Sequence, residues 1–256
     1  MSSATYHTNF LTPTPRKVQD INQNGVVRSF VASKKNYLFF KRIFDILFSA
    51  FTILVVLSWL LPLIALLIKF DSKGPVFFKQ NRTGLNGKSF SCLKFRTMIG
   101  NDEADERQAA ENDDRITGIG KFLRRINLDE LPQFFNVLVG HMSIVGPRPH
   151  MISDCIRFSF VISSYQFRNL VKPGITGLAQ IKGYHGPTAD YESIIIRYYW
   201  DAQYVRKAGL WLDLKIIGIT IIQSLSNLVL VGFHIFGKTR KSTVMGSLPV
   251  RKTSSY

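Results

Sequence analysis

The amino-acid sequence predicts a mixed α/β fold, mostly helical, with an N-terminal re-entrant membrane helix, a small β-hairpin and interfacial amphipathic helices. Three observations predict it. Residues 43–70 form an apolar run that contains only two charged side chains. Two strand-like runs, 74–80 and 89–98, are separated by a glycine-rich turn. Beyond them, apolar residues recur at helical spacing in 120–140 and dominate 210–236.

The composition describes a folded and strongly basic chain. Of the 256 residues, 46% are hydrophobic and 20% are charged, which excludes a disordered chain, a collagen-like repeat and a disulfide scaffold. Lysine and arginine number 33 against 17 aspartate and glutamate, so the formal net charge is +16. Such an excess indicates a polyanionic partner: nucleic acid, a phospholipid surface or a phosphorylated substrate.

The order of polar and apolar segments predicts four regions. Residues 1–36 are polar and predict a flexible N-terminal tail, and residues 37–72 predict the re-entrant membrane helix. Residues 73–236 form the main, membrane-associated domain. Residues 237–256 form a basic C-terminal tail that suits an anionic membrane surface.

The apolar run at 43–70 is long enough to cross a bilayer. At about 1.5 Å per residue it would make a helix about 42 Å long, against a bilayer core of about 30 Å. Pro62 lies inside the run, where a proline removes a backbone donor and kinks a helix. Basic residues flank both ends of the run, and positive charge favours the cytoplasmic side of a membrane. We therefore favour a helix that enters the membrane and returns at Pro62, while a simple span stays open.

The predicted hairpin places two basic side chains on one face. Lys94 and Arg96 are two residues apart on the second strand, and alternate residues of a strand point to the same side. They are candidate contacts for phosphate or lipid, and the alternative is a solvated basic face. Residues 101–114, which follow, are rich in acidic side chains and predict a solvated loop or an exposed helix.

The strongest candidates for chemistry are two adjacent carboxylates, Asp129 and Glu130, which follow Arg124 and Arg125. Pro132 predicts a helix with Asp129 as its N-cap, because a proline in the first turn loses little. A helix N-terminus attracts phosphate, and arginine binds phosphate through two hydrogen bonds. A carboxylate set against a bound phosphate can be a nucleophile, and its neighbour can hold a divalent cation. The alternative is a capped helix entry with surface ion pairs.

Arg148 lies between Pro147 and Pro149, in a stiff loop that can present its guanidinium to an anion or simply form a structural corner. The histidines have no metal-ligand spacing. The sequence also has no phosphate-binding glycine loop and no Gly-x-Ser-x-Gly nucleophile motif. The predicted chemistry therefore depends on the carboxylate pair and on the basic residues.

Seven motifs occur in the order found in bacterial sugar transferases, the monotopic phosphoglycosyl transferases. They are residues 41–45, 74–84, 94–98, 128–136, 142–149, 172–177 and 211–215. Each motif is weak alone, but the ordered set resembles this family from about Phe40 to Thr220. The resemblance implies transfer of a sugar 1-phosphate from a UDP-sugar to undecaprenyl phosphate with release of UMP, as the first step of exopolysaccharide or related glycan assembly.

The resemblance also implies roles for single residues. Asp129 would attack the β-phosphate and carry the phosphosugar covalently, and Glu130 would bind Mg²⁺ beside the reacting phosphate. The residues that match substrate-binding positions of the family are Lys94, Arg124, Arg148 and Asp201. Arg96 joins them as a candidate because it shares a strand face with Lys94.

Two residues depart from the family pattern. The helix of family members breaks at a Ser-Pro pair, whereas this chain has Leu61 before Pro62 and loses the serine hydroxyl. His185 stands where related glucose-1-phosphate transferases often carry arginine. The departure at His185 leaves the sugar unassigned. The expected donor is UDP-glucose or UDP-galactose, with N-acetylated sugars left open.

The resemblance implies that the 73–236 domain is catalytic and lies on the cytoplasmic face of a bacterial inner membrane. Its expected partners are a UDP-sugar, undecaprenyl phosphate and anionic membrane lipids. Nucleic acid is not expected among them, and a homo-oligomer stays open. The sequence does not identify the polysaccharide that the enzyme would help to make.

Two other hypotheses remain at this point. A membrane-anchored basic module could bind anionic lipid or nucleic acid without catalysis, which the net charge supports. A hydrolase could use Asp129 and Glu130 as a carboxylate pair. However, adjacent helical residues point about 100° apart, which suits poorly two carboxylates on either side of a glycosidic bond.

Overall fold

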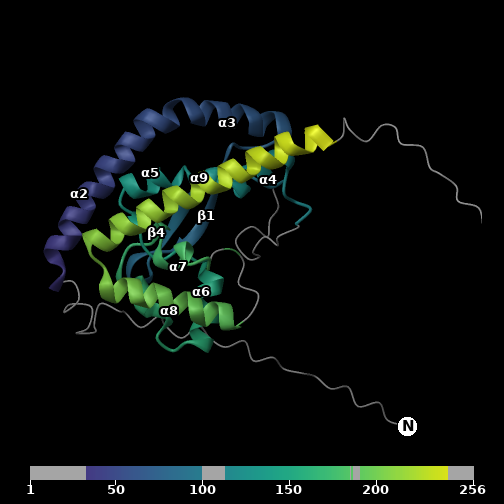
Figure 1. Ribbon diagram of the computed structural model, residues 1–256. Helices are drawn as coiled ribbons and strands as arrows, with labels where there is room; N and C mark the ends of the chain where they lie inside the picture. Colours follow the sequence, from purple (N-terminus) through teal and green to yellow (C-terminus); the bar gives the residue numbers. More distant parts are fainter. Residues whose placement is uncertain (1–32, 100–112, 185, 187–190, 242–256) are drawn as a thin grey trace, which may run out of the picture.

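The structure of the protein is a computed structural model that describes residues 33–99, 113–184, 186 and 191–241, without the side chains of 231–241. In Figure 1, two long helical segments lie over a smaller domain of short helices and two-stranded sheets. The fold is mostly helical with a small antiparallel hairpin, as the sequence predicts.

The N-terminal apolar run forms one continuous arc. Helix α2 (Lys35–Phe51) leads through a π-helical turn, η2 (Thr52–Leu57), into α3 (Ser58–Asp71), and the arc covers the top of the molecule in Figure 1. Pro62 lies inside α3, so the helix does not end there. The proline leaves the carbonyl of Ser58 without its intrahelical donor, and the widened turn η2 ends directly before that residue. The irregular part of the helix therefore begins well before the proline.

Both halves of this arc are fixed to the same domain. In α2, the ammonium group of Lys41 donates to the carboxylate of Asp213 over 2.7 Å, and both side chains are buried. In α3, Ile64 packs in a buried apolar cluster with Phe95 and Leu123. Residues near the two ends of the arc thus meet one domain through a buried ion pair and an apolar cluster.

The predicted β-hairpin is confirmed. Strand β1 (Phe77–Thr83) pairs antiparallel with β2 (Ser89–Phe95), and a short 3₁₀ turn, η3 (Leu85–Gly87), joins them. The first strand begins three residues later than predicted. The backbone of Gly74 has a φ of +127°, and a Cβ there would lie 2.1 Å from the guanidinium of Arg96. These residues therefore form the turn that leaves α3 rather than the start of the strand.

The segment that carries the two carboxylates is less helical than predicted. Helix α4 (Gly118–Arg125) is followed by a single 3₁₀ turn, η4 (Leu128–Glu130), and only then by α5 (Gln133–Leu138). The prediction that Asp129 caps a helix is wrong, because Asp129 lies inside η4. Asn127 has a left-handed φ of 57°, a conformation that asparagine tolerates well, and it separates η4 from α4.

The remaining elements complete the domain. They are β3 (Ser143–Val145), α6 (Ile152–Val161), η5 (Tyr165–Leu170), β4 (Gly174–Thr176), α7 (Leu178–Ile181), α8 (Tyr191–Lys207) and α9 (Leu210–Lys241). Strands β3 and β4 pair in parallel, in a region that the sequence predicts only as glycine- and proline-rich loops. A Cβ on Gly146 would lie 2.3 Å from the carbonyl oxygen of Lys172, so glycine allows this close approach.

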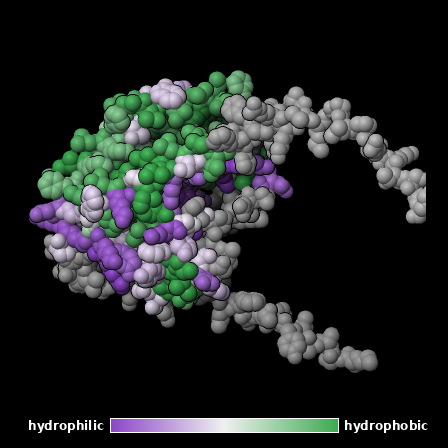
Figure 2. Space-filling model, in the orientation of Figure 1, coloured by the Kyte–Doolittle hydropathy of each residue, from purple (hydrophilic) through white to green (hydrophobic). Residues whose placement is uncertain are grey.

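Among the described residues, two stretches of helix are long and apolar enough to cross a membrane, Lys35–Asp71 and Leu210–Leu230. Only 22% and 11% of their most apolar windows are buried, so neither has the burial of a core helix in a soluble protein. In Figure 2, apolar side chains cover the part of the molecule where α2, α3 and α9 lie. These helices indicate a membrane protein, as the sequence predicts.

Several predicted segments lie partly or wholly outside the described residues. They are most of the tails 1–36 and 237–256, most of the acidic stretch 101–114, and His185. Helix α2 begins at Lys35 and α9 runs to Lys241, so each long helix extends a short way into a predicted tail.

Candidate active site

A cavity of about 970 Å³ opens between the hairpin, η4, the loop after β3, and α9. The hairpin contributes Lys94, and η4 contributes Asp129 and Glu130. The loop after β3 contributes Arg148 and His150, and α9 forms a further wall. Residues that are far apart in the sequence therefore meet around one cavity that has both charged and apolar walls.

Glu130 is held by two cations. Its Oε1 accepts a hydrogen bond from Lys94 over 2.7 Å, and both of its carboxylate oxygens accept from the guanidinium of Arg148. Burial alone would raise the pKa of Glu130, but the charges of Arg148 and Lys94, with their hydrogen bonds, hold that pKa well below its usual range. Glu130 is therefore a permanently ionised anchor for both cations.

Asp129 has the opposite surroundings. Its side chain is 8% exposed and lines the cavity, yet no hydrogen bond or ion pair of Asp129 occurs within the described part of the chain. Burial raises the pKa of Asp129, and the nearby negative charge of Glu130 adds to this, while Lys94 opposes it. Asp129 therefore offers the cavity a carboxylate that no cation holds, which is the state of a nucleophile.

Arg124 and Arg96 both line the cavity, but their guanidinium groups have different hydrogen-bond partners. The Nε of Arg124 donates to the hydroxyl of Thr97 over 2.8 Å, which fixes the guanidinium beside η4. The guanidinium of Arg96 instead donates to the backbone carbonyls of Lys73 and Ser72, directly after α3. Arg96 thus joins the helical arc to the hairpin. The alternation of side chains along the strand did not predict this structural role.

Asp201 does not line the cavity. It forms an ion pair of 2.8 Å with Arg168, and both side chains are almost completely buried, with 1% and 2% exposed. The guanidinium of Arg168 also donates to the backbone carbonyl of Arg148. Asp201 therefore acts at a distance, by fixing the loop that carries Arg148, rather than by contact with a ligand.

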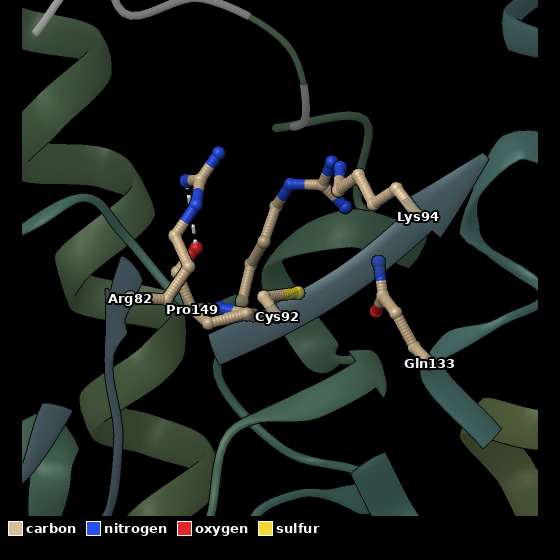
Figure 3. A pocket seen from close by; sticks show the side chains of 6 residues that line it. Arg82, Cys92, Lys94, Gln133 and Pro149 are labelled. Atoms are coloured by element: carbon tan, nitrogen blue, oxygen red, sulfur yellow. Dashed lines mark hydrogen bonds between the residues drawn. The ribbon is translucent and has the colours of Figure 1, made fainter. Parts of the chain in front are cut away.

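A smaller pocket lies beside the carboxylate pair (Figure 3). Arg82 and Lys94 project from neighbouring strands to the same side of the hairpin, with Cys92 between them, and Gln133 of α5 lies below Lys94 in this view. The guanidinium of Arg82 donates to the carbonyl of Pro149 over 3.1 Å. Arg82 therefore supports the Pro-Arg-Pro loop and adds a third cation near the carboxylates.

The wall of the large cavity has more positive than negative charge. Its basic residues are Lys73, Arg82, Lys94, Arg96, Arg115, Arg124, Arg148 and Arg197, and its acidic residues are Asp129, Glu130 and Asp154. An excess of cations around a cavity of this volume favours a polyanionic ligand with several phosphate groups.

The donor atoms suit a magnesium ion that arrives with a phosphate ligand. Within the described residues, no group of three His, Cys, Asp or Glu side chains could hold a metal alone. However, Oε2 of Glu130 accepts only from Arg148, so one of its lone pairs is left. Mg²⁺ takes one or two carboxylates and completes its shell with waters and substrate phosphates. Glu130 therefore fits as a single protein ligand.

The sequence matches the family model described as bacterial sugar transferase over residues 36–227. The chain belongs to the bacterial sugar transferase family. The family resemblance predicted from the seven motifs is thereby confirmed. The match covers the arc α2–α3, the carboxylate pair and most of the described α9 side chains.

The relatives of this chain differ in length. The chain is 46% identical over 213 residues to the UDP-glucose:undecaprenyl-phosphate glucose-1-phosphate transferase of Klebsiella pneumoniae, covering 82% of this chain and 46% of the relative. It is 44% identical over 194 residues to the exopolysaccharide production protein PSS of Rhizobium leguminosarum bv. phaseoli, covering 74% of this chain and 96% of that protein. The chain therefore spans about half the length of the first relative and almost all of the second.

Four residues of this bacterial sugar transferase site did not follow from sequence reasoning. They are Arg82, His150, Arg168 and Arg197. Arg82 could have been found, because the hairpin register places it on the same face as Lys94. His150 lies in the loop after β3 and has no ligand spacing to other histidines. Arg168 and Arg197 carry no local pattern, because only tertiary packing brings η5 and α8 to this loop.

Proposed function

We propose that this chain transfers glucose 1-phosphate from UDP-glucose to undecaprenyl phosphate and releases UMP. Four relatives are named UDP-glucose:undecaprenyl-phosphate glucose-1-phosphate transferases. Two others are named exopolysaccharide production proteins, which supports a role at the first step of exopolysaccharide or related glycan assembly. The excess of cations around the cavity supports a nucleotide diphosphate as donor.

In the first half-reaction, a carboxylate oxygen of Asp129 attacks the β-phosphorus of UDP-glucose. A bond forms between Asp129 and phosphorus, the bond from phosphorus to the bridging oxygen breaks, and the electron pair leaves on UMP. In the second half-reaction, an oxygen of undecaprenyl phosphate attacks the same phosphorus and releases the carboxylate of Asp129. The covalent aspartyl-phosphosugar splits one difficult transfer into two easier ones.

The cations around the pair stabilise charge on the phosphoryl oxygens. Lys94 and Arg148 are already oriented by Glu130, so they need little rearrangement when a phosphate binds. Arg124, fixed by Thr97, lies near Asp129 and adds a further cation to the site. Phosphoryl transfer depends mostly on such positioning and electrostatic stabilisation.

We include Mg²⁺ as the cofactor of this reaction. Glu130 would hold it through the remaining lone pair of Oε2, together with oxygens of the substrate. When bound, the ion would neutralise charge on the diphosphate. Glu130 would keep its ion pairs with Lys94 and Arg148 at the same time.

The single observation that carries the proposal is the contrast within the carboxylate pair. Glu130 is ion-paired to two cations, whereas Asp129 has no partner among the described residues and lines the same cavity. Two carboxylates that served only as surface ion pairs would both be expected to have cationic partners. The division supports Asp129 as nucleophile and Glu130 as the residue that orders the cations.

The long helices support a lipid substrate and a re-entrant topology. Since α2 and α3 both pack on one domain, the two halves of the arc belong on the same side of a membrane. The charge of +16 suits the anionic lipids of the cytoplasmic leaflet. Apolar residues of the cavity wall, such as Phe78 and Leu225, would face the start of the polyprenyl chain. We therefore propose the cytoplasmic face of the inner membrane as the location.

UMP release by the purified protein in detergent tests the proposed function. The assay would contain Mg²⁺, undecaprenyl phosphate and, in parallel, UDP-glucose, UDP-galactose and UDP-N-acetylgalactosamine, because one relative is named for the last of these. We expect UMP from UDP-glucose, none from Asp129→Asn, and loss of the signal with EDTA that excess Mg²⁺ restores. Silence across the panel from folded protein would contradict the proposal and favour a membrane-anchored binding module.

A further inference from the structure

Buried polar atoms without a partner gather around the cavity. Six buried side-chain nitrogen or oxygen atoms in the described residues have no hydrogen-bond partner. Five of them belong to residues that line the cavity: Arg82, Arg96, His150, Gln180 and Arg197. Buried polar groups are normally hydrogen-bonded in native proteins, so this concentration indicates atoms kept ready for a ligand.

His150 is held in a fixed orientation by two aromatic neighbours. Its side chain is buried, and its Nδ1 shares a hydrogen bond with the hydroxyl of Tyr165. The imidazole ring also meets the ring of Phe158 edge-on, with 5.7 Å between the ring centroids. Because Nδ1 is occupied by Tyr165, the unpartnered Nε2 is the atom that the ring offers to the cavity.

His150 offers this atom as a neutral group. Burial lowers the pKa of His150 well below its usual value, and the positive charges of Arg168 and Arg197 lower it further. A neutral imidazole adds no charge to a phosphate site, whereas it makes one directional hydrogen bond to a neutral polar group.

The other unpartnered atoms also suit hydroxyl groups. The Nε of Arg197 is a donor, and the Oε1 of Gln180 is an acceptor. Oxygens of an ionised phosphate accept hydrogen bonds but do not donate them, so a phosphate cannot satisfy both. Hydroxyl groups of a sugar both donate and accept. With the Nε atoms of Arg82 and Arg96, three of these atoms are arginine donors that suit phosphate, but the acceptor of Gln180 does not. The mixture therefore favours a ligand that carries hydroxyl groups as well as phosphates.

The location of His150 fits the hexose rather than the uracil of the donor. His150 lies two residues beyond Arg148, which holds Glu130 next to the nucleophile Asp129. The hexose is bonded to the phosphate that Asp129 attacks, whereas uracil is separated from that phosphate by a second phosphate and a ribose. The charge of Arg148 lowers the pKa of His150, so the imidazole lies near the guanidinium that binds Glu130, and we expect it to meet the hexose before the uracil.

We propose that His150 determines sugar specificity, by a hydrogen bond from its Nε2 to a hydroxyl of the hexose, with Arg197 beside it. This inference rests on the proposed function, because it assumes that a nucleotide sugar occupies the cavity. Tyr165 and Phe158 orient the imidazole, and the chemical class of the ligand is the hexosyl group of a UDP-sugar.

Two substitutions distinguish the contributions of Nδ1 and Nε2 of His150. His150→Asn keeps a polar atom near Nδ1 for Tyr165 but removes the atom that faces the cavity, whereas His150→Gln extends an amide toward the position of Nε2. The measurement is the affinity of the full-length protein in detergent for UDP-glucose and for UDP, which lacks the sugar. We expect H150N to weaken UDP-glucose binding about tenfold and to leave UDP binding unchanged. The affinity of H150Q for UDP-glucose should fall clearly less than that of H150N.

The outcomes are distinct. Equal weakening of UDP-glucose and UDP, or no weakening of either, would overturn the inference. If H150N does not fold, the ¹⁵N-histidine spectrum of the wild-type protein decides, with H150Q used to assign the resonance. The Nε2 signal of His150 should shift with UDP-glucose and not with UDP, and the same shift with both ligands would contradict a sugar contact. A wild-type protein that binds neither ligand and releases no UMP would instead refute the proposed function.

Discussion

Asp129 and Glu130 are neighbours in the chain with opposite electrostatic surroundings. Burial and the negative charge of Glu130 raise the pKa of Asp129, whereas Arg148 and Lys94 overcome burial and lower the pKa of Glu130. Pairs of titratable groups whose surroundings separate their pKa values commonly divide two catalytic roles between them. Here the division fits the proposed roles, in which Asp129 is the nucleophile and Glu130 holds the cations.

This contrast predicts opposite effects on stability. A carboxyl whose pKa is raised by folding destabilises the folded state at pH values above both its pKa values, so Asp129→Asn should raise the melting temperature at pH 7. A carboxyl whose pKa is lowered stabilises the fold above its unfolded pKa and loses this only as the pH falls toward its folded pKa. Glu130→Gln should therefore lower the melting temperature at pH 7. We expect the two variants to differ by at least about 4 °C.

Thermal unfolding in one detergent at pH 7 and pH 5 checks this prediction. The deficit of Glu130→Gln should persist at pH 5, because that pH still lies above the usual pKa of a glutamate, about 4.3. Both variants should lose activity, so the melting temperature is the measurement that distinguishes the two roles. A melting temperature that falls equally in both variants would contradict the assignment of roles.

At the scale of residues, sequence reasoning found most of the charged residues that line the cavity but not the residues that support them. The motifs identified Asp129, Glu130, Lys94 and Arg148, which the structure brings to one cavity. Asp201 was predicted to bind substrate, but it is buried against Arg168. A motif records that an aspartate occurs at a position and does not record whether it faces a ligand or a neighbouring side chain.

At the scale of elements, side chains of η5 and α8 fix the loop after β3 through hydrogen bonds and an ion pair. Arg168 of η5 joins Asp201 of α8 to the backbone of Arg148, and Tyr165 of η5 joins the same loop through His150. The position of the loop that carries Arg148 therefore depends on the packing of η5 against α8.

Asp201→Asn tests this support. The substitution keeps a hydrogen bond to Arg168 but removes the charge, so the loop should loosen without loss of the ligand-binding atoms. We expect kcat for UMP release to fall about tenfold or more, and the affinity for UDP-glucose to change by less than about threefold. Asp201→Glu, which keeps the charge, should recover part of kcat. An affinity loss as large as the loss of kcat would instead indicate direct contact with substrate.

Elements with a strong local pattern were predicted well, and those that depend on distant partners were not. The hairpin was found because its strands alternate around a glycine-rich turn. The parallel pair of β3 and β4 was missed, because each strand has three residues and pairs across a long connection. The helix expected at Asp129 was replaced by η4, because Asn127 turns the backbone into the left-handed region.

At the scale of the whole molecule, the arc α2–α3 packs against one domain in both its halves. If this packing holds in a membrane, both ends of the arc lie on the same side of it. Single cysteines at Lys35 and Lys73, both exposed, test this in sealed vesicles. The native Cys92 and Cys155 are buried and should react slowly. We expect an impermeant thiol reagent to label both positions from the cytoplasmic side, whereas labelling from opposite sides would establish a simple span.

The most direct test of the central claim is the site of the covalent intermediate. The purified protein would be incubated with Mg²⁺ and UDP-glucose in the absence of undecaprenyl phosphate, quenched in acid, and analysed by mass spectrometry of its peptides. We predict a hexose-phosphate adduct on Asp129 that disappears when undecaprenyl phosphate is added. An adduct on any other residue, or full turnover by Asp129→Asn, would contradict the account.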